Sequence, residues 1–289
     1  MKKLPVPPEA DGDRVDSFLR RYLPELPGKA VQAAFNRRDV KLDGKRVPKD
    51  ARISAGQELQ IFYSDIPEVD PLSVVYEDDD VLLVNKAAGI SVEPDSGGGI
   101  SLTELCLRHV RLLNPESQPP AACHRLDNQT CGLLLFAKNP RSRDILEDVF
   151  RRRTLDKRYT CLVRGTMKPP EATCKAYLVK HAREGRVSVF DHEVPGSRLI
   201  LTAYRTLSQE GQLSRLEVHL ITGRTHQIRA HMAALGHPLL GDDLYGDRAF
   251  NRQMKAQGKL MLCASSLCLD TQGRLPALDG VTFTIPCPF

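Results

Sequence analysis

Two polar segments hold the residue types that could do chemistry. The first, residues 123–132, reads CHRLDNQTCG and stands directly before the apolar run 133–136. Polar residues in a loop at the edge of a strand are a common place for function. Asp127 is the carboxylate of this segment, with His124 and Arg125 just before it. The spacing alone fits a catalytic carboxylate and a structural ion pair alike.

The second segment, residues 220–232, reads LITGRTHQIRAHM. Its Thr-Gly pair ends a predicted strand, and Thr225 is placed to cap a following helix. His226 and Arg229 are three residues apart, so on one helix they share a face and can point at one anionic site. A capped helix with a surface arginine remains the simpler alternative.

A metal site is not indicated by the spacing of the possible ligands. His226, His231 and His237 are separated by five and six residues, which does not give the i, i+4 histidine pair of the H-E-x-x-H motif. Eight cysteines contain no C-x-x-C pair, and several stand in apolar company, which favours reduced thiols. They lie at positions 106, 123, 131, 161, 174, 263, 268 and 287.

The elements that must position these segments are mostly short strands from residue 73 onward. Strand-like runs are expected at 81–84, 132–137, 159–163, 174–179, 187–190, 199–205, 213–221, 260–263 and 281–285. Helices are expected at 101–113, 141–152 and 225–235. Strands that follow one another with occasional helices predict an α+β fold around a bent, mixed and mostly antiparallel sheet. No Gly-rich phosphate loop occurs in the sequence, so we expect no nucleotide cofactor.

The N-terminal part predicts a separate small domain over residues 12–63. Asp13 can cap a helix with an apolar stripe from Val15 to Leu23, and a second helix is expected at 29–38. Residues 40–47 read VKLDGKRV, two short strands around an Asp-Gly hairpin signal. Two helices followed by a basic hairpin resemble the small RNA-binding domain of ribosomal small-subunit protein four. The resemblance implies that Arg37, Arg38, Lys41, Lys45 and Arg46 face RNA phosphates, while a basic appendage without an RNA role remains the alternative.

Charge and composition agree with a polyanionic partner. The chain of 289 residues has a formal net charge of +5, and residues 1–63 hold 13 Lys and Arg against 9 Asp and Glu. A positive module suits RNA, because phosphate contacts release counterions.

Residues 64–72 are expected to form a linker, and 73–289 the catalytic domain. No apolar run approaches the roughly 20 residues of a membrane span, and no secretion signal is evident, so a cytoplasmic location is expected.

Four motifs in order resemble the RluA-type pseudouridine synthases. They are VLLVNKAAG at 81–89, HRLDNQTCGLLLFAK at 124–138, KRYTCLVRG at 157–165, and TGRTHQIRAHM at 222–232 with its continuation GHPLLGDDLYG at 236–246. One such match could be chance, but four in family order over residues 76–265 make a specific resemblance. It implies an enzyme that isomerises uridine to pseudouridine in RNA without a cofactor.

The resemblance also implies roles for individual residues. Asp127 stands at the catalytic position, as nucleophile or as base, and Arg229 would pair with its charge. Tyr159 would lie against a flipped-out uracil, and Arg125 would fill the space that the base leaves. His124, Thr130, Arg224, Thr225 and His226 are further candidates for substrate binding.

The sequence departs from the family pattern at three positions. Ala87 and Cys131 stand where proline and serine are usual, and Glu93 where histidine often stands. Ribosomal RNA is expected as substrate rather than transfer RNA, and a monomer is expected. The rival interpretations are an RNA-binding or ribosome-assembly factor that keeps the fold without activity, and a glycosidase or nuclease. The last two lack the second carboxylate or the cage of acids that they usually need.

Overall fold

The computed structural model describes residues 2–23, 28–62, 72–94 and 100–289. Contacts between residues divide the chain into two compact units, Met1–Leu72 with Glu93–Leu105, and Ser73–Val92 with Cys106–Phe289. We call them the N-terminal unit and the large unit. The predicted linker at 64–72 lies, apart from Leu72, outside the described residues.

The N-terminal unit packs two helices against a four-stranded sheet of order β1-β4-β2-β3. Its elements are β1 (Lys2–Pro5), η1 (Pro8–Ala10), α1 (Val15–Tyr22), α2 (Gly28–Asn36), β2 (Val40–Leu42), β3 (Lys45–Arg46) and β4 (Glu58–Ile61). β1 precedes the predicted domain start at residue 12, yet it pairs with β4 along its whole length.

Two local predictions in this unit have different outcomes. The Asp-Gly hairpin is confirmed, because Asp43 and Gly44 both have positive φ between β2 and β3. The prediction that Asp13 caps the first helix is wrong. Arg14 is the N-cap of α1, and no side chain caps it. The helix is held instead by its buried face of Val15, Phe18 and Leu19.

The large unit contains, among the described residues, one sheet of eleven strands. Its main path runs β11-β10-β12-β13-β9-β14-β8-β6-β5, with β15 beside β14 and β7 beside β8. The strands are β5 (Val74–Glu77), β6 (Val81–Lys86), β7 (Ala121–Ala122), β8 (Cys131–Ala137), β9 (Leu155–Arg164), β10 (Glu171–His181), β11 (Arg186–Phe190), β12 (Arg198–Glu210), β13 (Leu213–Leu220), β14 (Leu262–Leu269) and β15 (Thr282–Thr284). The helices are α3 (Leu102–Leu113), which begins in the N-terminal unit, α4 (Pro140–Arg152), η2 (Ala182–Glu184), α5 (Gln227–Ala234) and α6 (Arg248–Gln253).

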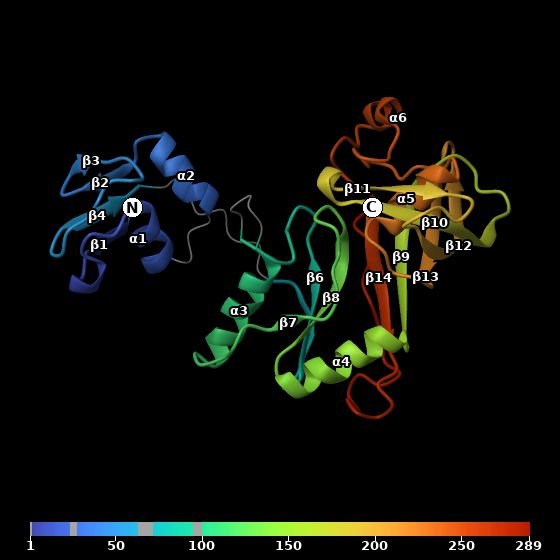
Figure 1. The fold of residues 1–289 in the computed structure, drawn as a ribbon, viewed down its shortest axis with the longest axis horizontal. Coiled ribbons are helices and arrows are strands. Elements are labelled where there is room, and N and C mark those ends of the chain that lie inside the picture. Colours follow the sequence, from blue (N-terminus) through green and yellow to red (C-terminus); the bar gives the residue numbers. More distant parts are fainter. Residues whose placement is uncertain (1, 24–27, 63–71, 95–99) are drawn as a thin grey trace. The chain divides into compact units, whose positions relative to one another are not determined.

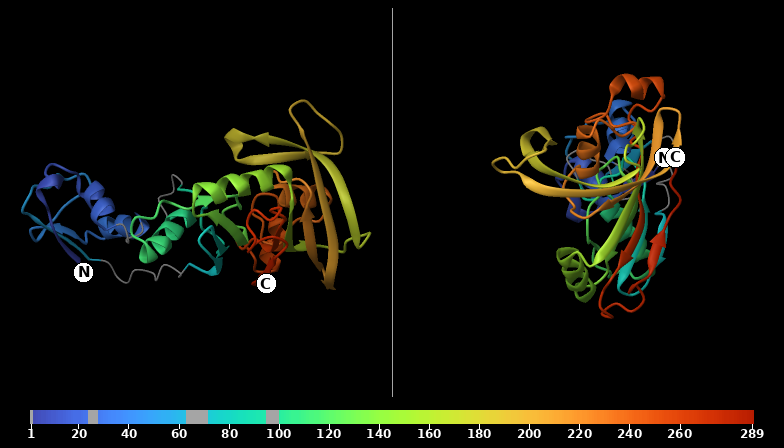
Figure 2. Two further views of the ribbon diagram at one scale, coloured as in Figure 1. Left: turned by 90° about the horizontal axis from the view of Figure 1, so that it is seen from below. Right: turned by 90° about the vertical axis from the view of Figure 1, so that its right-hand side faces the viewer.

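The sheet of the large unit is mostly antiparallel and bent. Among the described residues, all strand pairs of the large unit are antiparallel except β8 with β14. Figure 2 shows that β10 and β12, in yellow and gold, curve away from the strands around β14. The predicted α+β class with a bent, mostly antiparallel sheet is therefore confirmed.

The core beneath β8 fixes the segment that carries Asp127. All seven residues of β8 are buried, and Leu133 and Leu135 pack with Leu146 and Val149 of α4. Asn139 caps α4 by accepting a hydrogen bond from the Ser142 amide at 2.8 Å. Because β8 is buried along its whole length, it fixes the C-terminal end of the loop that carries Asp127.

None of the described helices combines the length and the apolar character that a membrane-spanning helix needs.

Candidate active site

The loop that carries Asp127 is tied down by the first of the four motifs. Lys86 at the end of β6 donates from Nζ to the Asn128 carbonyl at 2.8 Å, and the Gly89 amide donates to the same oxygen at 2.9 Å. Lys86 is fully buried, and burial lowers the pKa of its ammonium to about 8 although Cys131 and Asp127 act in the opposite direction. A buried lysine thus holds the residue next to Asp127 by its backbone.

A glycine allows the strand after this loop to enter the sheet. Gly132 has φ +116, and a Cβ there would lie 2.4 Å from the Ala264 carbonyl oxygen and 2.5 Å from its nitrogen. Ala264 of β14 is the register partner of Gly132 on one side and of Tyr159 on the other. One strand therefore separates the strand that follows Asp127 from the strand that carries Tyr159, a distance of about 10 Å between their backbones.

Helix α5 presents its polar residues inward. Gln227 to Met232 are all buried, so each polar group among them needs a partner. Gln227 accepts from the Arg224 amide and from Thr222 Oγ1, and it donates to Thr202 Oγ1. The prediction that Thr225 caps this helix is wrong, because His226 is the N-cap and no side chain caps it. The Gln227 side chain supports the turn in its place.

Arg229 joins two carboxylates. Its Nε and Nη2 donate to the two oxygens of Asp242 at 2.8 and 2.9 Å, and its Nη1 donates to Asp127 Oδ2 at 3.2 Å. The Asp242 side chain is fully buried and also accepts from the amides of Leu244 and Tyr245. Burial opposes both charges, but the pairing outweighs it, so the pKa of Arg229 is raised and that of Asp242 is lowered. The guanidinium is thereby fixed with one donor free for Asp127.

His226 also lies near the Asp127 carboxylate. Its backbone is left-handed, with φ 52, which is uncommon for a residue with a side chain and is often found at functional sites. Its Nε2 lies 3.8 Å from Asp127 Oδ2, and its Nδ1 lies 2.9 Å from the Tyr245 hydroxyl oxygen. Burial lowers the pKa of the imidazole, which favours the neutral ring. The second segment thus places two nitrogen groups near one carboxylate oxygen, although His226 lies before the helix and not on a helix face shared with Arg229 as its spacing predicted.

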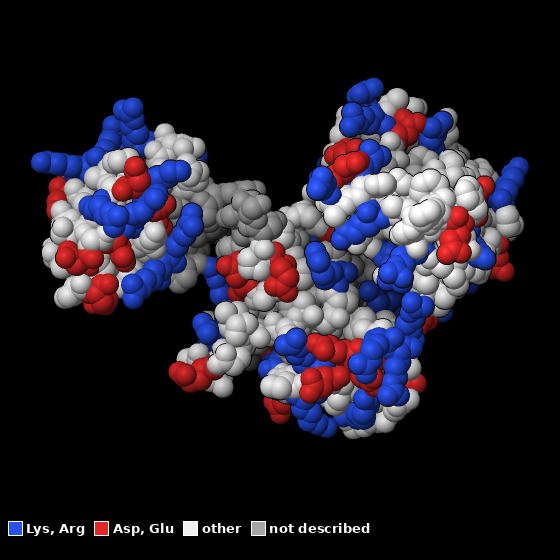
Figure 3. Space-filling view, viewed as in Figure 1, with Lys and Arg blue, Asp and Glu red and all other residues white. Residues whose placement is uncertain are grey.

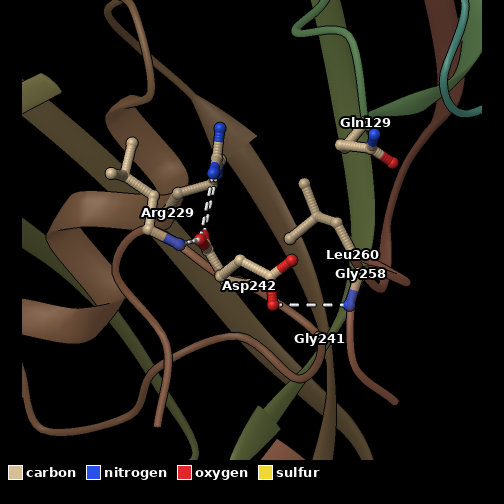
Figure 4. Close-up of a pocket in the computed structure, with 8 residues that line it drawn as sticks. Gln129, Arg229, Gly241, Asp242, Gly258 and Leu260 are labelled. Carbon is tan, nitrogen blue, oxygen red and sulfur yellow. Dashed lines mark hydrogen bonds and ion pairs between the residues drawn. The ribbon is translucent and has the colours of Figure 1, made fainter. Parts of the chain in front are cut away.

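A hollow of about 230 Å³ lies beside this cluster (Figure 4). Gln129, Arg229, Gly241, Asp242, Asp243, Leu244, Gly258 and Leu260 line it. Figure 4 shows the Arg229 and Asp242 side chains directed at one another on one side, with Gln129 on the other. Asp127 and Tyr159 are not among the lining residues, so this hollow adjoins the carboxylate cluster and does not enclose it.

Two predicted site residues, Tyr159 and His124, form no hydrogen bond or ion pair with the Asp127 side chain in the described part of the chain. Tyr159 is 5% exposed on β9, and Lys157 Nζ lies 5.6 Å from its ring centroid. His124 stacks on Phe150 with ring centroids 5.0 Å apart, and its Nε2 accepts from the Leu135 amide at 3.3 Å. Burial and the neighbouring lysine charge hold the pKa of His124 well below its usual range. Its contacts are those of a residue that supports β8.

The remaining candidates near the two loops are divided between surface and interior. Arg125, Arg224 and Thr225 are exposed. Thr130 is buried, its amide donates to the Asp127 carbonyl at 3.0 Å, and its Oγ1 has no hydrogen-bond partner among the described residues. Thr130 therefore supports the turn after Asp127 through its backbone.

Basic residues gather on the N-terminal unit, as Figure 3 shows in blue. Arg37, Arg38, Lys45 and Arg46 are exposed, and Lys41 is half-buried with Nζ 5.0 Å from the Phe62 ring centroid. Lys41 and Arg46 are register partners in β2 and β3, so they lie side by side on one face of the hairpin. The hairpin thus presents neighbouring positive charges to solvent.

Sequence reasoning assigned no role to Asp242, Tyr245 or Lys86. Asp242 and Tyr245 stand within the run 236–246, and Lys86 within 81–89, so the motifs contained all three. Their position within these motifs was the one feature of the sequence that could have indicated a role for them. The pairing of Asp242 with Arg229 joins residues thirteen positions apart and required the folded chain.

Comparison with known proteins agrees with this architecture. The sequence profile of the family described as RNA pseudouridylate synthase matches residues 80–234. The ribosomal large subunit pseudouridine synthase C of Vibrio vulnificus is 31% identical over 273 residues, covering 89% of this chain and 84% of its own. The protein of the same name from Escherichia coli is 30% identical over 288 residues, covering 92% and 88%.

Solved structures show the same fold. The human protein RNA Pseudouridylate Synthase Domain Containing 1 aligns with a TM-score of 0.63 at 28% identity, covering 78% of this chain and 87% of its own. Human RNA Pseudouridylate Synthase Domain Containing 4 aligns with a TM-score of 0.62 at 21% identity, covering 75% and 88%. The chain belongs to the RNA pseudouridylate synthase family, and within it to the RluA type. The resemblance predicted from the four motifs, and the class of enzyme that it implied, are confirmed.

Proposed function

We propose that this chain isomerises specific uridines to pseudouridine in structured RNA, and that Asp127 is the catalytic carboxylate. The observation that carries the proposal is the fixed pairing of Asp127 with Arg229 at 3.2 Å, in the two loops that hold the family motifs. The reaction breaks the N-glycosidic bond, turns the uracil and joins it to the ribose through carbon five, while the carbon-five proton leaves. As an isomerisation it consumes no second substrate.

The geometry around Asp127 suits either mechanism for this carboxylate. As nucleophile or as base, it acts as a carboxylate anion, and the Arg229 guanidinium donates to its Oδ2 at 3.2 Å as the complementary charge. Arg229 and His226 both contact the Oδ2 atom of the Asp127 carboxylate. Its side chain is 24% exposed, so a substrate can approach the other oxygen. The same carboxylate thus combines a fixed charge with access.

Other residues complete the proposal. A uridine paired in a duplex cannot reach Asp127, so the base must be extruded, and the exposed Arg125 occupies the space that it leaves. Tyr159 contacts the extruded uracil and handles the carbon-five proton. His124 and Thr130 support the Asp127 loop, and Arg224, Thr225 and His226 contact the RNA beside it.

Ribosomal RNA is the proposed substrate, bound in part by the N-terminal unit. The matched relatives from Vibrio vulnificus and Escherichia coli are named as enzymes of the large ribosomal subunit. The neighbouring charges of Lys41, Lys45 and Arg46 suit a phosphate backbone, because contacts of this kind release counterions. This unit resembles the domain of ribosomal small-subunit protein four. The protein is proposed to act in the cytoplasm as a monomer.

Tritium release from RNA labelled at uridine carbon five tests the activity and the substrate together. Transcripts of large-subunit ribosomal RNA and of transfer RNAs are incubated with the full chain. Release from the ribosomal transcript alone is expected. Release from transfer RNA alone would contradict the substrate assignment. Tight binding without release from any RNA would instead indicate a binding factor that keeps the fold without activity.

A further inference from the structure

The hydroxyl of Tyr245 connects the backbone of β11 to His226. Its oxygen accepts a hydrogen bond from the Val187 amide at 2.9 Å and lies 2.9 Å from His226 Nδ1. Across the described part of the chain, no other acceptor lies within hydrogen-bond distance of this hydroxyl. The Tyr245 side chain is half-buried. A phenol has one hydrogen, and its oxygen here already accepts from the Val187 amide, so the arrangement in which Tyr245 donates to His226 Nδ1 gives both groups a complementary partner.

This donation decides which ring nitrogen of His226 carries hydrogen. Nδ1 accepts, so in the neutral imidazole the hydrogen is on Nε2. The charged groups that face the ring are Asp127, Arg229, Asp242 and Lys180. Burial is the largest influence on the pKa of His226 and lowers it, with Arg229 and Lys180 acting in the same direction and the two carboxylates against it. In this tautomer the protonated nitrogen, Nε2, is the ring atom that lies 3.8 Å from Asp127 Oδ2.

Two nitrogen groups thus lie near one oxygen of Asp127. Arg229 Nη1 donates to Oδ2 at 3.2 Å, and His226 Nε2 lies 3.8 Å from the same oxygen, which is longer than a hydrogen bond in this structure. Among the described residues, no side chain forms a hydrogen bond or an ion pair with Oδ1. Tyr245 supports both donors, because its ring meets the His226 ring edge-on at 5.6 Å and lies under the Arg229 guanidinium at 5.3 Å.

We propose that Tyr245 is a positioning residue that sets the tautomer of His226, and that His226 and Arg229 together hold Asp127 Oδ2 and leave Oδ1 to react. The second half of this proposal rests on the proposed catalytic role of Asp127, whereas the tautomer does not. His226 acts here as a hydrogen-bond donor to the carboxylate and not as a proton-transfer group.

The tautomer can be measured without any RNA. Long-range proton–nitrogen correlation spectra of the full chain, labelled with nitrogen-15 histidine, distinguish Nε2–H from Nδ1–H, and the His226→Gln variant identifies the signal. We expect Nε2–H in the wild type and a mixture of tautomers in Tyr245→Phe, which keeps the ring but loses the hydroxyl. Tyr204→Phe is the matched control, since that hydroxyl donates to the Pro169 carbonyl at 2.9 Å away from the site. Nδ1–H in the wild type, or no change in Tyr245→Phe, would overturn the assignment.

Single-turnover tritium release tests the function of the His226 donor. His226→Leu removes the donor at similar size, and His226→Gln restores an N–H near the position of Nε2. We expect the Leu variant to react about 10- to 100-fold more slowly, and the Gln variant to recover most of the rate. Equal rates for Leu and wild type, or equally slow Leu and Gln variants, would overturn the role at Oδ2. Absence of release from the wild type would refute the proposed function and this role together, while the tautomer spectra would still decide the first half.

Discussion

Gly132→Ala is expected to destabilise the large unit strongly, because the main chain of β14 occupies the space that a Cβ needs. The new atom would meet the carbonyl oxygen, the nitrogen and the carbonyl carbon of Ala264 at 2.4, 2.5 and 2.8 Å. β14 is held on its other side by β9, so it cannot move away alone. Strain at φ +116 costs about 1–3 kcal/mol and the overlap a further 1–3 kcal/mol, so the expected loss is roughly 2–6 kcal/mol.

Urea unfolding measures this loss, and a second glycine provides the control. The chain has no tryptophan, so far-ultraviolet circular dichroism is the suitable signal. Gly185 has φ +63 and no atom within 4 Å of its Cβ position, so Gly185→Ala isolates the backbone strain at about 1–2 kcal/mol. If Gly132→Ala loses no more than this control, the close approach of β8 and β14 does not position the Asp127 loop as we argue.

Three further predictions concern charges. As pH rises from about 8 to about 10.4, the unfolding free energy of the wild type should rise relative to that of Lys86→Met, because over this window Lys86 is protonated in the unfolded chain and deprotonated in the folded chain. The difference in urea-unfolding free energy between the two proteins should change by up to roughly 3 kcal/mol. A difference that does not depend on pH would contradict the burial argument. Asp242→Asn removes the fully buried carboxylate that pairs with Arg229 and leaves the guanidinium paired with the partly exposed Asp127; it should lower the unfolding free energy by about 3–5 kcal/mol at pH 7, where a loss below about 1 kcal/mol would refute the importance of the Arg229–Asp242 pair. Replacing Lys41, Lys45 and Arg46 together by Ala should reduce the slope of log affinity for RNA against log salt by about 2, measured by filter binding, and an unchanged slope would exclude the hairpin from RNA contact.

Strands with a clear alternation of apolar and polar residues could be predicted from the sequence. Strands whose conformation depends on pairing with neighbouring strands could not. The alternation within Leu213–Leu220 predicted β13 almost to the residue. β14 was expected to end at residue 263 but continues to Leu269, through a stretch that includes Ala264, Ser265 and Ser266. Small and polar residues carry a weak strand preference, and here pairing with β9 and β15 decides the structure. The sequence analysis did not predict α6, because this helix has only six residues, with Asp247 as its N-cap.

The candidate site shows the same division. The three-residue spacing of His226 and Arg229 predicted a common anionic target on one helix face. Arg229 Nη1 and His226 Nε2 lie 3.2 and 3.8 Å from Asp127 Oδ2. His226, however, precedes the helix and has a left-handed backbone conformation. Asp242 and Tyr245 became visible only as partners of these two residues. The sequence motifs contained all of these residues, but the hydrogen bonds between them depend on the folded structure and could not be predicted from the motifs.

Asp127→Asn tests the central claim most directly. The substitution keeps the shape of the side chain and removes its charge, so the protein should fold and bind ribosomal RNA nearly as the wild type does. Asp191→Asn, at an exposed carboxylate of the same unit, is the control. In single-turnover tritium release from RNA labelled at uridine carbon five, we expect no detectable reaction for Asp127→Asn and full reaction for Asp191→Asn. A rate near that of the wild type in the Asp127→Asn variant would contradict the catalytic role of this carboxylate.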